Sequence, residues 1–178
     1  MNVQPRYRLA IAIVASVGVV VVVLVAVLLA GGGGPLATPT PSTSASASTD
    51  PMSTPEGAVR AFFEAFAEAR RTDDPALVEP LVTSKQSSAY LSVAGFLGGQ
   101  KEVKKASVTT VLRIENVSVD TSGASATVTF EYTEGGYDVS LDTGQALESP
   151  VVLPTVTVTV DVKQVDGRWL VDRYESRS

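Results

Sequence analysis

The chain contains no histidine and no cysteine, so its reactive side chains are carboxylates, tyrosines and simple hydroxyls. A Ser-His-Asp triad, a histidine general base, a cysteine nucleophile and the common zinc sites are therefore excluded. The candidate catalytic residues are Tyr90, Tyr137 and Asp138, which could form an acid-base set if the fold brings them together. Each also has an ordinary structural role as a core-edge ring or a solvated strand residue. We expect no metal and no cofactor.

An uncharged apolar run of 22 residues, Leu9 to Ala30, dominates the N-terminal part of the chain. As a helix it is roughly 33 Å long at about 1.5 Å per residue, which is the thickness of a bilayer core. Arg6 and Arg8 precede this run, and the first charge after it is Asp50. The positive-inside rule then predicts that residues 1–8 are cytoplasmic and that the rest is translocated. The sequence predicts a single-pass protein of the cell membrane with an extracytoplasmic C-terminal domain.

A cleaved signal peptide is the alternative interpretation of this run, because cleavage between Ala30 and Gly31 is conceivable. The run is longer than the usual signal-peptide core of about 7–15 residues. Leu28 also occupies a position at which the cleavage pattern requires a small residue. An uncleaved anchor is therefore favoured.

A linker and one globular domain are expected after the span. Residues 31–54 are mostly Gly, Pro, Ala, Ser and Thr, a composition typical of a flexible linker. Residues 55–178 have the length of a single domain. This domain holds 12 basic and 18 acidic residues once Arg6, Arg8 and Asp50 are set aside, so its formal charge is about −6. Such a charge argues against binding to nucleic acid.

Helical patterns fill the first third of the domain. Ser53 and Glu56 predict a capping box, and the apolar residues that follow at helical spacing predict a helix that ends near Asp73. A short second helix is expected over residues 76–83 and a third over residues 87–97, ended by Gly98-Gly99. Core or pocket positions are expected for four aromatic residues: Phe62, Phe63, Phe66 and Trp169.

Alternation with period two predicts strands beyond Lys105. The parity of the apolar residues changes near Glu115-Asn116, which indicates a bulge, and Asp166-Gly167 has the composition of a hairpin turn. These patterns predict an α+β fold, with three helices packed on a curved four-stranded antiparallel sheet.

This order of elements resembles the nuclear transport factor 2-like superfamily, which includes ketosteroid isomerase and polyketide-cyclase relatives. The residues that carry the resemblance are PEGAVRAFFEAFAEAR at 55–70 and VDGRWLVDRY at 165–174. The resemblance covers the whole domain and implies a cone formed by a curved sheet. The chain also resembles membrane-anchored members of this superfamily from actinobacterial envelopes. These include proteins associated with lipid transporters of the mammalian-cell-entry type. Enzymatic relatives place a tyrosine on the first helix, where this chain has only phenylalanines.

The predicted function is a non-enzymatic binding or accessory module of the bacterial envelope, which presents a cone pocket or a sheet face to a protein or lipid partner. One alternative is an isomerase-like or cyclase-like enzyme that uses tyrosine and aspartate as acid-base groups. Another is an accessory subunit of a lipid transporter.

A threonine-rich sheet face is the expected docking surface for a partner. Alternation places Thr129 and Thr157 on this face, which is suited to water and carries little charge over most of its area. We therefore expect the isolated domain, residues 55–178, to be a monomer.

Overall fold

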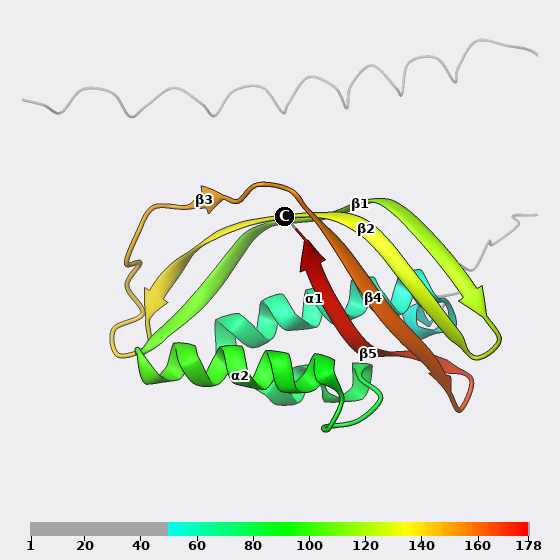
Figure 1. The fold of residues 1–178 in the computed structure, drawn as a ribbon. Coiled ribbons are helices and arrows are strands. Elements are labelled where there is room, and N and C mark those ends of the chain that lie inside the picture. Colours follow the sequence, from blue (N-terminus) through cyan, green and yellow to red (C-terminus); the bar gives the residue numbers. More distant parts are fainter. Residues whose placement is uncertain (1–49, 178) are drawn as a thin grey trace, which may run out of the picture. The chain divides into compact units, whose positions relative to one another are not determined.

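The computed structural model describes residues 50–177 (Figure 1). The predicted membrane span at Leu9 to Ala30 and most of the predicted linker lie outside the described residues, so these stay predictions. Within residues 50–177, no helix combines the length and the apolar character that a membrane crossing requires.

The first long helix, α1, spans Pro55–Thr72 and follows a single 3-10 turn, η1, at Pro51–Ser53. Its N-cap is Thr54, whose hydroxyl accepts a hydrogen bond from the Gly57 backbone N–H at 3.1 Å. The predicted cap at Ser53 is therefore wrong by one residue, because the 3-10 turn already contains Ser53. The helix ends at Asp73, which adopts the left-handed conformation with φ 55°.

The next two helical segments differ from the predicted ones in type and length. The segment η2 at Pro75–Leu81 is a 3-10 helix with Pro80 inside it, and α2 runs over Ser88–Glu102. Gly98 and Gly99, which were predicted to end this helix, lie inside α2, and both are exposed. A helix tolerates glycine in its interior, at a cost of about 1 kcal/mol in stability for each glycine. The buried side of α2 carries Ala89, Val93 and Leu97 at intervals of four, whereas Leu91 is 58% exposed.

The sheet has five strands, so the prediction of four is wrong by one. The strands are β1 (Lys105–Ser122), β2 (Ser125–Ser140), β3 (Val151–Val152), β4 (Val156–Val165) and β5 (Arg168–Arg177). The order is β1-β2-β4-β5, all antiparallel, and β3 pairs with β2. Because β4 pairs only with the first half of β2, the second half is left open for β3.

Two irregularities bend the β1-β2 ribbon. The predicted bulge near Glu115-Asn116 is confirmed, since the register shifts between Glu115 and Ser118 and Asn116 has φ 53°. A second shift, between Thr109 and Val111, was not predicted. The predicted turn at Asp166-Gly167 is confirmed by positive φ angles at both residues, as a tight hairpin requires.

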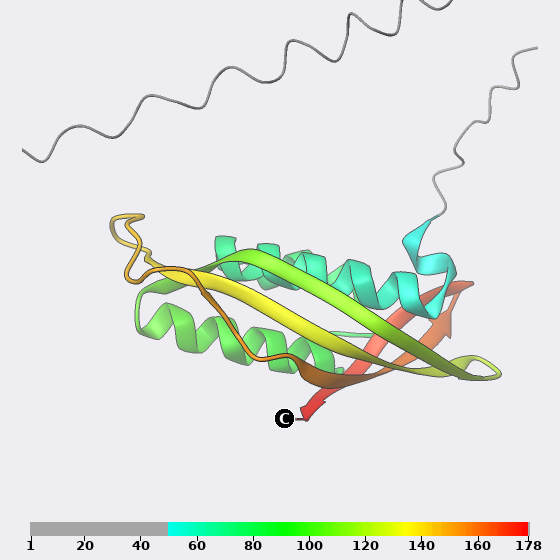
Figure 2. The ribbon, with the colours of Figure 1, turned by 90° about the horizontal axis from the view of Figure 1, so that it is seen from above.

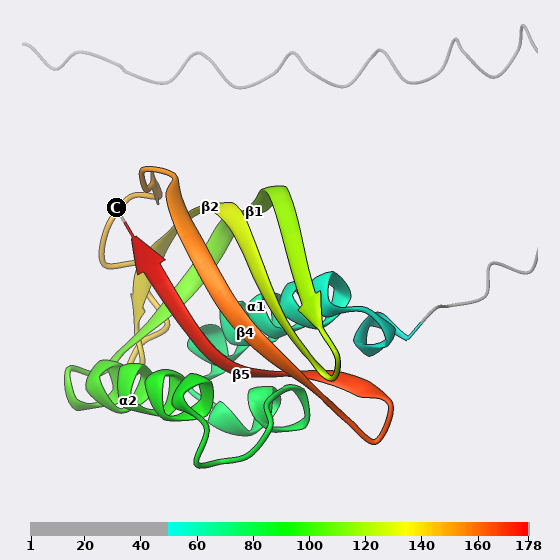
Figure 3. The same ribbon diagram turned by 45° about the vertical axis from the view of Figure 1, so that its right-hand side comes forward.

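The helices cover the concave face of the curled sheet (Figures 1 and 3). The burial pattern of β4 alternates buried valines with more exposed threonines, so the threonine-rich face lies on the opposite side. Phe62 and Phe130 are fully buried between the two layers, and Phe63 contacts Phe130 edge to face at 5.5 Å between ring centroids. Figure 2 shows α1 and α2 running beneath the long β1-β2 ribbon. The α+β class predicted from the sequence is therefore observed.

Two glycines provide a test of this geometry. A Cβ built on Gly136 would lie 2.1 Å from the Val108 carbonyl oxygen, whereas one built on Gly98 meets nothing within 4 Å. We expect Gly136→Ala to lower the free energy of unfolding by about 1–3 kcal/mol because the backbone must shift. Gly98→Ala should raise it by about 0.5–1 kcal/mol through helix propensity. Thermal unfolding of the full chain, followed by circular dichroism, measures both; equal effects would contradict the close approach.

Candidate functional site

A pocket of about 340 Å³ opens where the C-terminal ends of α1 and α2 meet the start of β1 and the end of β2. The loop from β2 to β4, which includes β3, forms its remaining wall. These segments lie together on the left of Figure 1, at the end of the sheet away from the β4-β5 hairpin. The volume falls in the range of small-molecule sites.

A buried ion pair forms part of the pocket wall. Arg70, on α1, is 7% exposed and donates two hydrogen bonds to the Glu134 carboxylate on β2, at 3.0 and 2.9 Å. Its Nη2 also donates to Thr109 Oγ1 at 3.2 Å, and the guanidinium lies 4.9 Å from the centre of the Phe66 ring. The Tyr132 hydroxyl donates to the same carboxylate at 2.6 Å. The network ties the end of α1 to the sheet through charge-assisted bonds.

The network keeps Glu134 ionised. Burial raises the pKa of Glu134, but the hydrogen bonds from Arg70 and Tyr132 together outweigh it and hold the pKa below the usual value of 4.5. Burial and the neighbouring carboxylate raise the pKa of Tyr132 far above its usual range. Glu134 is thus a weak base and Tyr132 a weak acid, the opposite of what proton transfer at neutral pH requires.

A second polar chain crosses the pocket between α2 and the sheet. The Gln100 side-chain amide donates to Ser107 Oγ, which in turn donates to Asp138 Oδ1 at 2.8 Å. Lys105 Nζ lies 3.5 Å from the other oxygen of Asp138. Two buried atoms at the pocket have no hydrogen-bond partner among the described residues: the Oε1 acceptor of Gln100 and the Nε donor of Arg70.

The rim of the pocket is apolar. Phe96, on α2, is 44% exposed and packs edge to face on Phe66 with ring centroids 5.8 Å apart. Val151 and Leu153, from the loop opposite, are about half exposed and line the same opening. Glu148 lies among them and takes part in no ion pair within residues 50–177.

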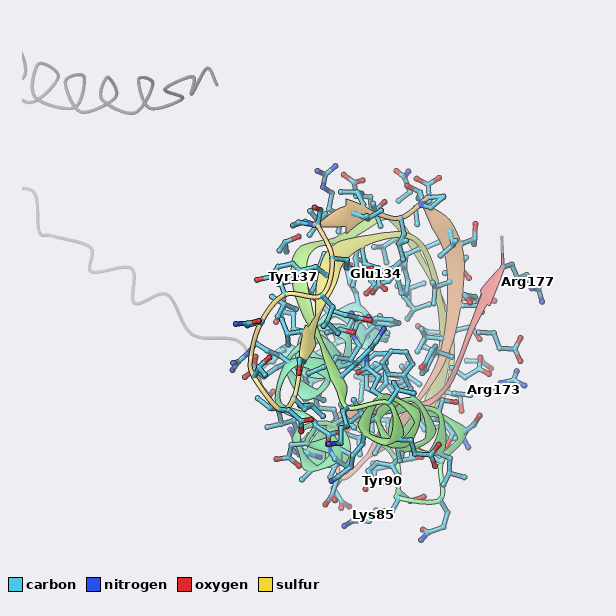
Figure 4. All side chains as sticks on the ribbon, turned by 90° about the vertical axis from the view of Figure 1, so that its left-hand side faces the viewer. Lys85, Tyr90, Glu134, Tyr137, Arg173 and Arg177 are labelled. Atoms are coloured by element: carbon cyan, nitrogen blue, oxygen red, sulfur yellow. The ribbon has the colours of Figure 1, made fainter. Side chains whose placement is uncertain are left out.

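The candidate catalytic residues do not all converge. Tyr137 and Asp138 line the pocket, next to Glu134 on the same strand. Tyr90 does not, because its hydroxyl points to Glu79 at 3.4 Å. Figure 4 shows Tyr90 beside Lys85 at the bottom, apart from Glu134 and Tyr137 near the top.

The four aromatic residues expected in the core or pocket are all buried: Phe62, Phe63, Phe66 and Trp169. None of them lines the pocket, although Phe66 supports it through Phe96 and Arg70. On the sheet, Thr157 is exposed and Thr129 half-buried, on the face away from the helices. A docking role for these two threonines stays a prediction.

Four functional residues were missed by the sequence analysis: Arg70, Phe96, Gln100 and Glu134. A signal existed for one of them, since Phe62, Phe66 and Arg70 follow one another at intervals of four on α1. A charged residue that continues an apolar helix stripe lies on the buried face, where it needs a partner.

Comparison with known proteins supports the fold. No family model matches the chain, and no curated protein does either. Among solved structures, the intermembrane space region of the chloroplast protein ARC6 is similar with 14% identity and a TM-score of 0.54, and the match covers 69% of this chain and 93% of that one. This likeness shows a shared fold and nothing about activity.

Other similar structures carry the nuclear transport factor 2-like name. One is a protein of unknown function from Shewanella oneidensis, with 13% identity, a TM-score of 0.46, and coverage of 70% of this chain and 100% of that one. Another comes from Salmonella enterica, with 12% identity, a TM-score of 0.44, and coverage of 67% and 87%. The solved structures similar to this chain therefore include proteins of the nuclear transport factor 2-like superfamily. The membrane-anchored envelope type stays a prediction.

The ion pair makes stability depend on pH. Glu134→Gln leaves the Arg70 charge buried without a counter-charge, so we expect the free energy of unfolding to fall by about 3 kcal/mol at pH 7. Because the folded pKa of Glu134 is depressed, its contribution is complete above about pH 4.5 and is lost as the pH falls through the folded pKa. The difference between wild type and Glu134→Gln should therefore shrink below pH 4.5.

Urea unfolding of the full chain at several pH values measures this difference. Glu64→Gln is the matched control, because Glu64 is an exposed carboxylate on the same helix as Arg70. A gap between wild type and Glu134→Gln that stays constant down to pH 3 would contradict the proposed role of the pair.

Proposed function

We propose that the chain is a membrane-tethered binding module whose pocket holds a ligand without transforming it. The observation that carries this proposal is the pairing of three ionisable groups at the pocket: Arg70, Glu134 and Asp138. Arg70 and Glu134 satisfy each other through two hydrogen bonds, and Asp138 is engaged by Ser107 and Lys105. Side chains that already take part in hydrogen bonds and ion pairs can orient a ligand. A general base, by contrast, needs a free lone pair and a pKa near the working pH.

An isomerase-like or cyclase-like enzyme is the second candidate, and one observation favours it. Tyr137 and Asp138 both line the pocket, although neighbouring residues of a strand direct their side chains to opposite faces of the sheet. However, Tyr90 is not part of the pocket, and the Asp138 carboxylate already accepts a hydrogen bond from Ser107. Catalysis would need a substrate that displaces these contacts.

The tether belongs to the proposal as well. The apolar run at Leu9 to Ala30 and the arginines before it support an anchor with the domain outside the cytoplasm. A domain on such a tether is confined to a thin layer above the membrane, where it meets envelope components at high effective concentration. An accessory role beside a lipid transporter is one setting that fits this location.

Site-specific photo-crosslinking tests where the module binds. A photoreactive phenylalanine analogue at position 96 lies on the pocket rim, and we expect it to form an adduct with the ligand in illuminated cells, detected by mass spectrometry of the purified full chain. Position 91 is the matched control, because Leu91 is exposed on the same helix but outside the pocket. The same analogue at position 157 tests whether the ligand binds to the threonine-rich face.

An adduct at position 96 alone supports pocket binding. An adduct at position 157 without one at position 96 would move the binding site to the sheet face and overturn the proposal. Absence of any adduct at position 96 would also count against it.

The orientation in the membrane can be tested independently. An alkaline phosphatase that folds only after export, fused behind Ser178, should be active in a bacterial host because the C-terminal domain is translocated. Loss of this activity would contradict the orientation. A mature protein recovered from the medium and beginning near Gly31 would instead contradict the uncleaved anchor.

A further inference from the structure

We propose that the pocket recognises a cationic nitrogen carried on an apolar stem, such as an alkyl or aryl ammonium group. This inference deepens the proposed binding function and rests on it. It follows from the charges, the unpartnered acceptor and the apolar rim that meet in the same pocket.

The charges at the pocket favour a cation. Three carboxylates line the pocket, from Glu134, Asp138 and Glu148, against the single guanidinium of Arg70. That guanidinium is neutralised by Glu134 through two hydrogen bonds, so it has little charge to offer to an anion.

The lysines near the pocket are also engaged. Each of the three lysines around the end of α2 lies close to an aspartate: Lys101 to Asp73 at 3.5 Å, Lys104 to Asp142 at 2.8 Å, and Lys105 to Asp138 at 3.5 Å. Glu148, by contrast, has no ion-pair partner within residues 50–177. A carboxylate or phosphate ligand would therefore meet repulsion in the pocket, and an ammonium group would meet an available counter-charge.

An acceptor without a donor points to the same ligand class. Gln100 Oε1 is buried at the pocket and receives no hydrogen bond within the described part of the chain. Leaving a buried acceptor without a hydrogen bond costs about 1–3 kcal/mol of stability. A small movement of the Gln100 side chain would let Oε1 accept a hydrogen bond from one of the three N–H donors of an ammonium group. The other unpartnered atom, Arg70 Nε, is a donor. The charge of its guanidinium is met by Glu134 and by the Phe66 ring, so it adds little attraction for an anion.

The rim and the volume define the stem. Phe96, Val151 and Leu153 offer apolar surface at the opening, and the exposed part of the Phe96 ring can also contact a cation. The volume of about 340 Å³ lies at the small end of the range for ligand sites. The ligand, or the part of it that enters, is therefore of the size of a short alkyl or a single-ring amine.

Three probes with the same phenethyl stem and head groups of different charge test the inference: phenethylamine, phenethyl alcohol and hydrocinnamate. Their binding to the full chain, held in nanodiscs of uncharged lipid at low salt, is measured by saturation-transfer NMR with empty nanodiscs as the blank. We expect the amine to bind at least about tenfold more tightly than the acid, with the alcohol between them. Phe96→Arg should abolish binding of the amine, and the matched variant Leu91→Arg should not, because Leu91 lies outside the pocket.

A second pair of variants isolates the charge. Glu148→Gln should weaken amine binding about two- to fivefold, as expected for a solvent-exposed ion pair, and leave alcohol binding unchanged. Glu64→Gln should affect neither. If the alcohol and the acid bind as tightly as the amine and Phe96→Arg abolishes all three, the ligand class is wrong and the pocket remains a binding site. If no probe shows binding that depends on Phe96, the proposed pocket function fails as well.

Discussion

The ion pair between Arg70 and Glu134 is the interaction on which the open end of the domain depends. It joins the end of α1 to β2, and Tyr132 and Thr109 complete its hydrogen bonds. Because burial penalises an isolated charge by several kcal/mol, neither partner can be retained without the other. The helix and the curled strand are therefore held in one relative position, and that position sets the width of the pocket beside them.

The second constraint is the close approach of three strands at Gly135-Gly136. A Cβ on Gly136 would collide with the backbone of β1, and one on Gly135 would lie 2.9 Å from the Val151 carbonyl oxygen of β3. Only glycine lets both neighbours pair with β2 at this point. The two glycines thus bring the loop that carries Val151 and Leu153 against the pocket, so the apolar rim exists because β2 lacks side chains there.

Periodicity predicted the parts of this fold that repeat. The apolar stripe of α1, the alternation of the long strands and the bulge near Asn116 are each encoded within a few neighbouring residues. The strand β3 has only two residues and therefore no period, and its pairing depends on the space left by β4. The site shows the same limit. Tyr137 and Asp138 could be named from the chemistry of their own side chains, whereas Arg70 and Glu134 meet across 64 positions of sequence. No local pattern specifies such a contact.

The aromatic core and the pocket occupy different parts of α1. The aromatic core around Phe62 and Phe63 fills the space under the middle of the sheet, while the polar network and the pocket occupy the C-terminal end of the helix. The chain enters at the other end of α1, which is about 27 Å away for an 18-residue helix. The aromatic core is filled, whereas the pocket end is held together by the Arg70–Glu134 ion pair and stays open beside it.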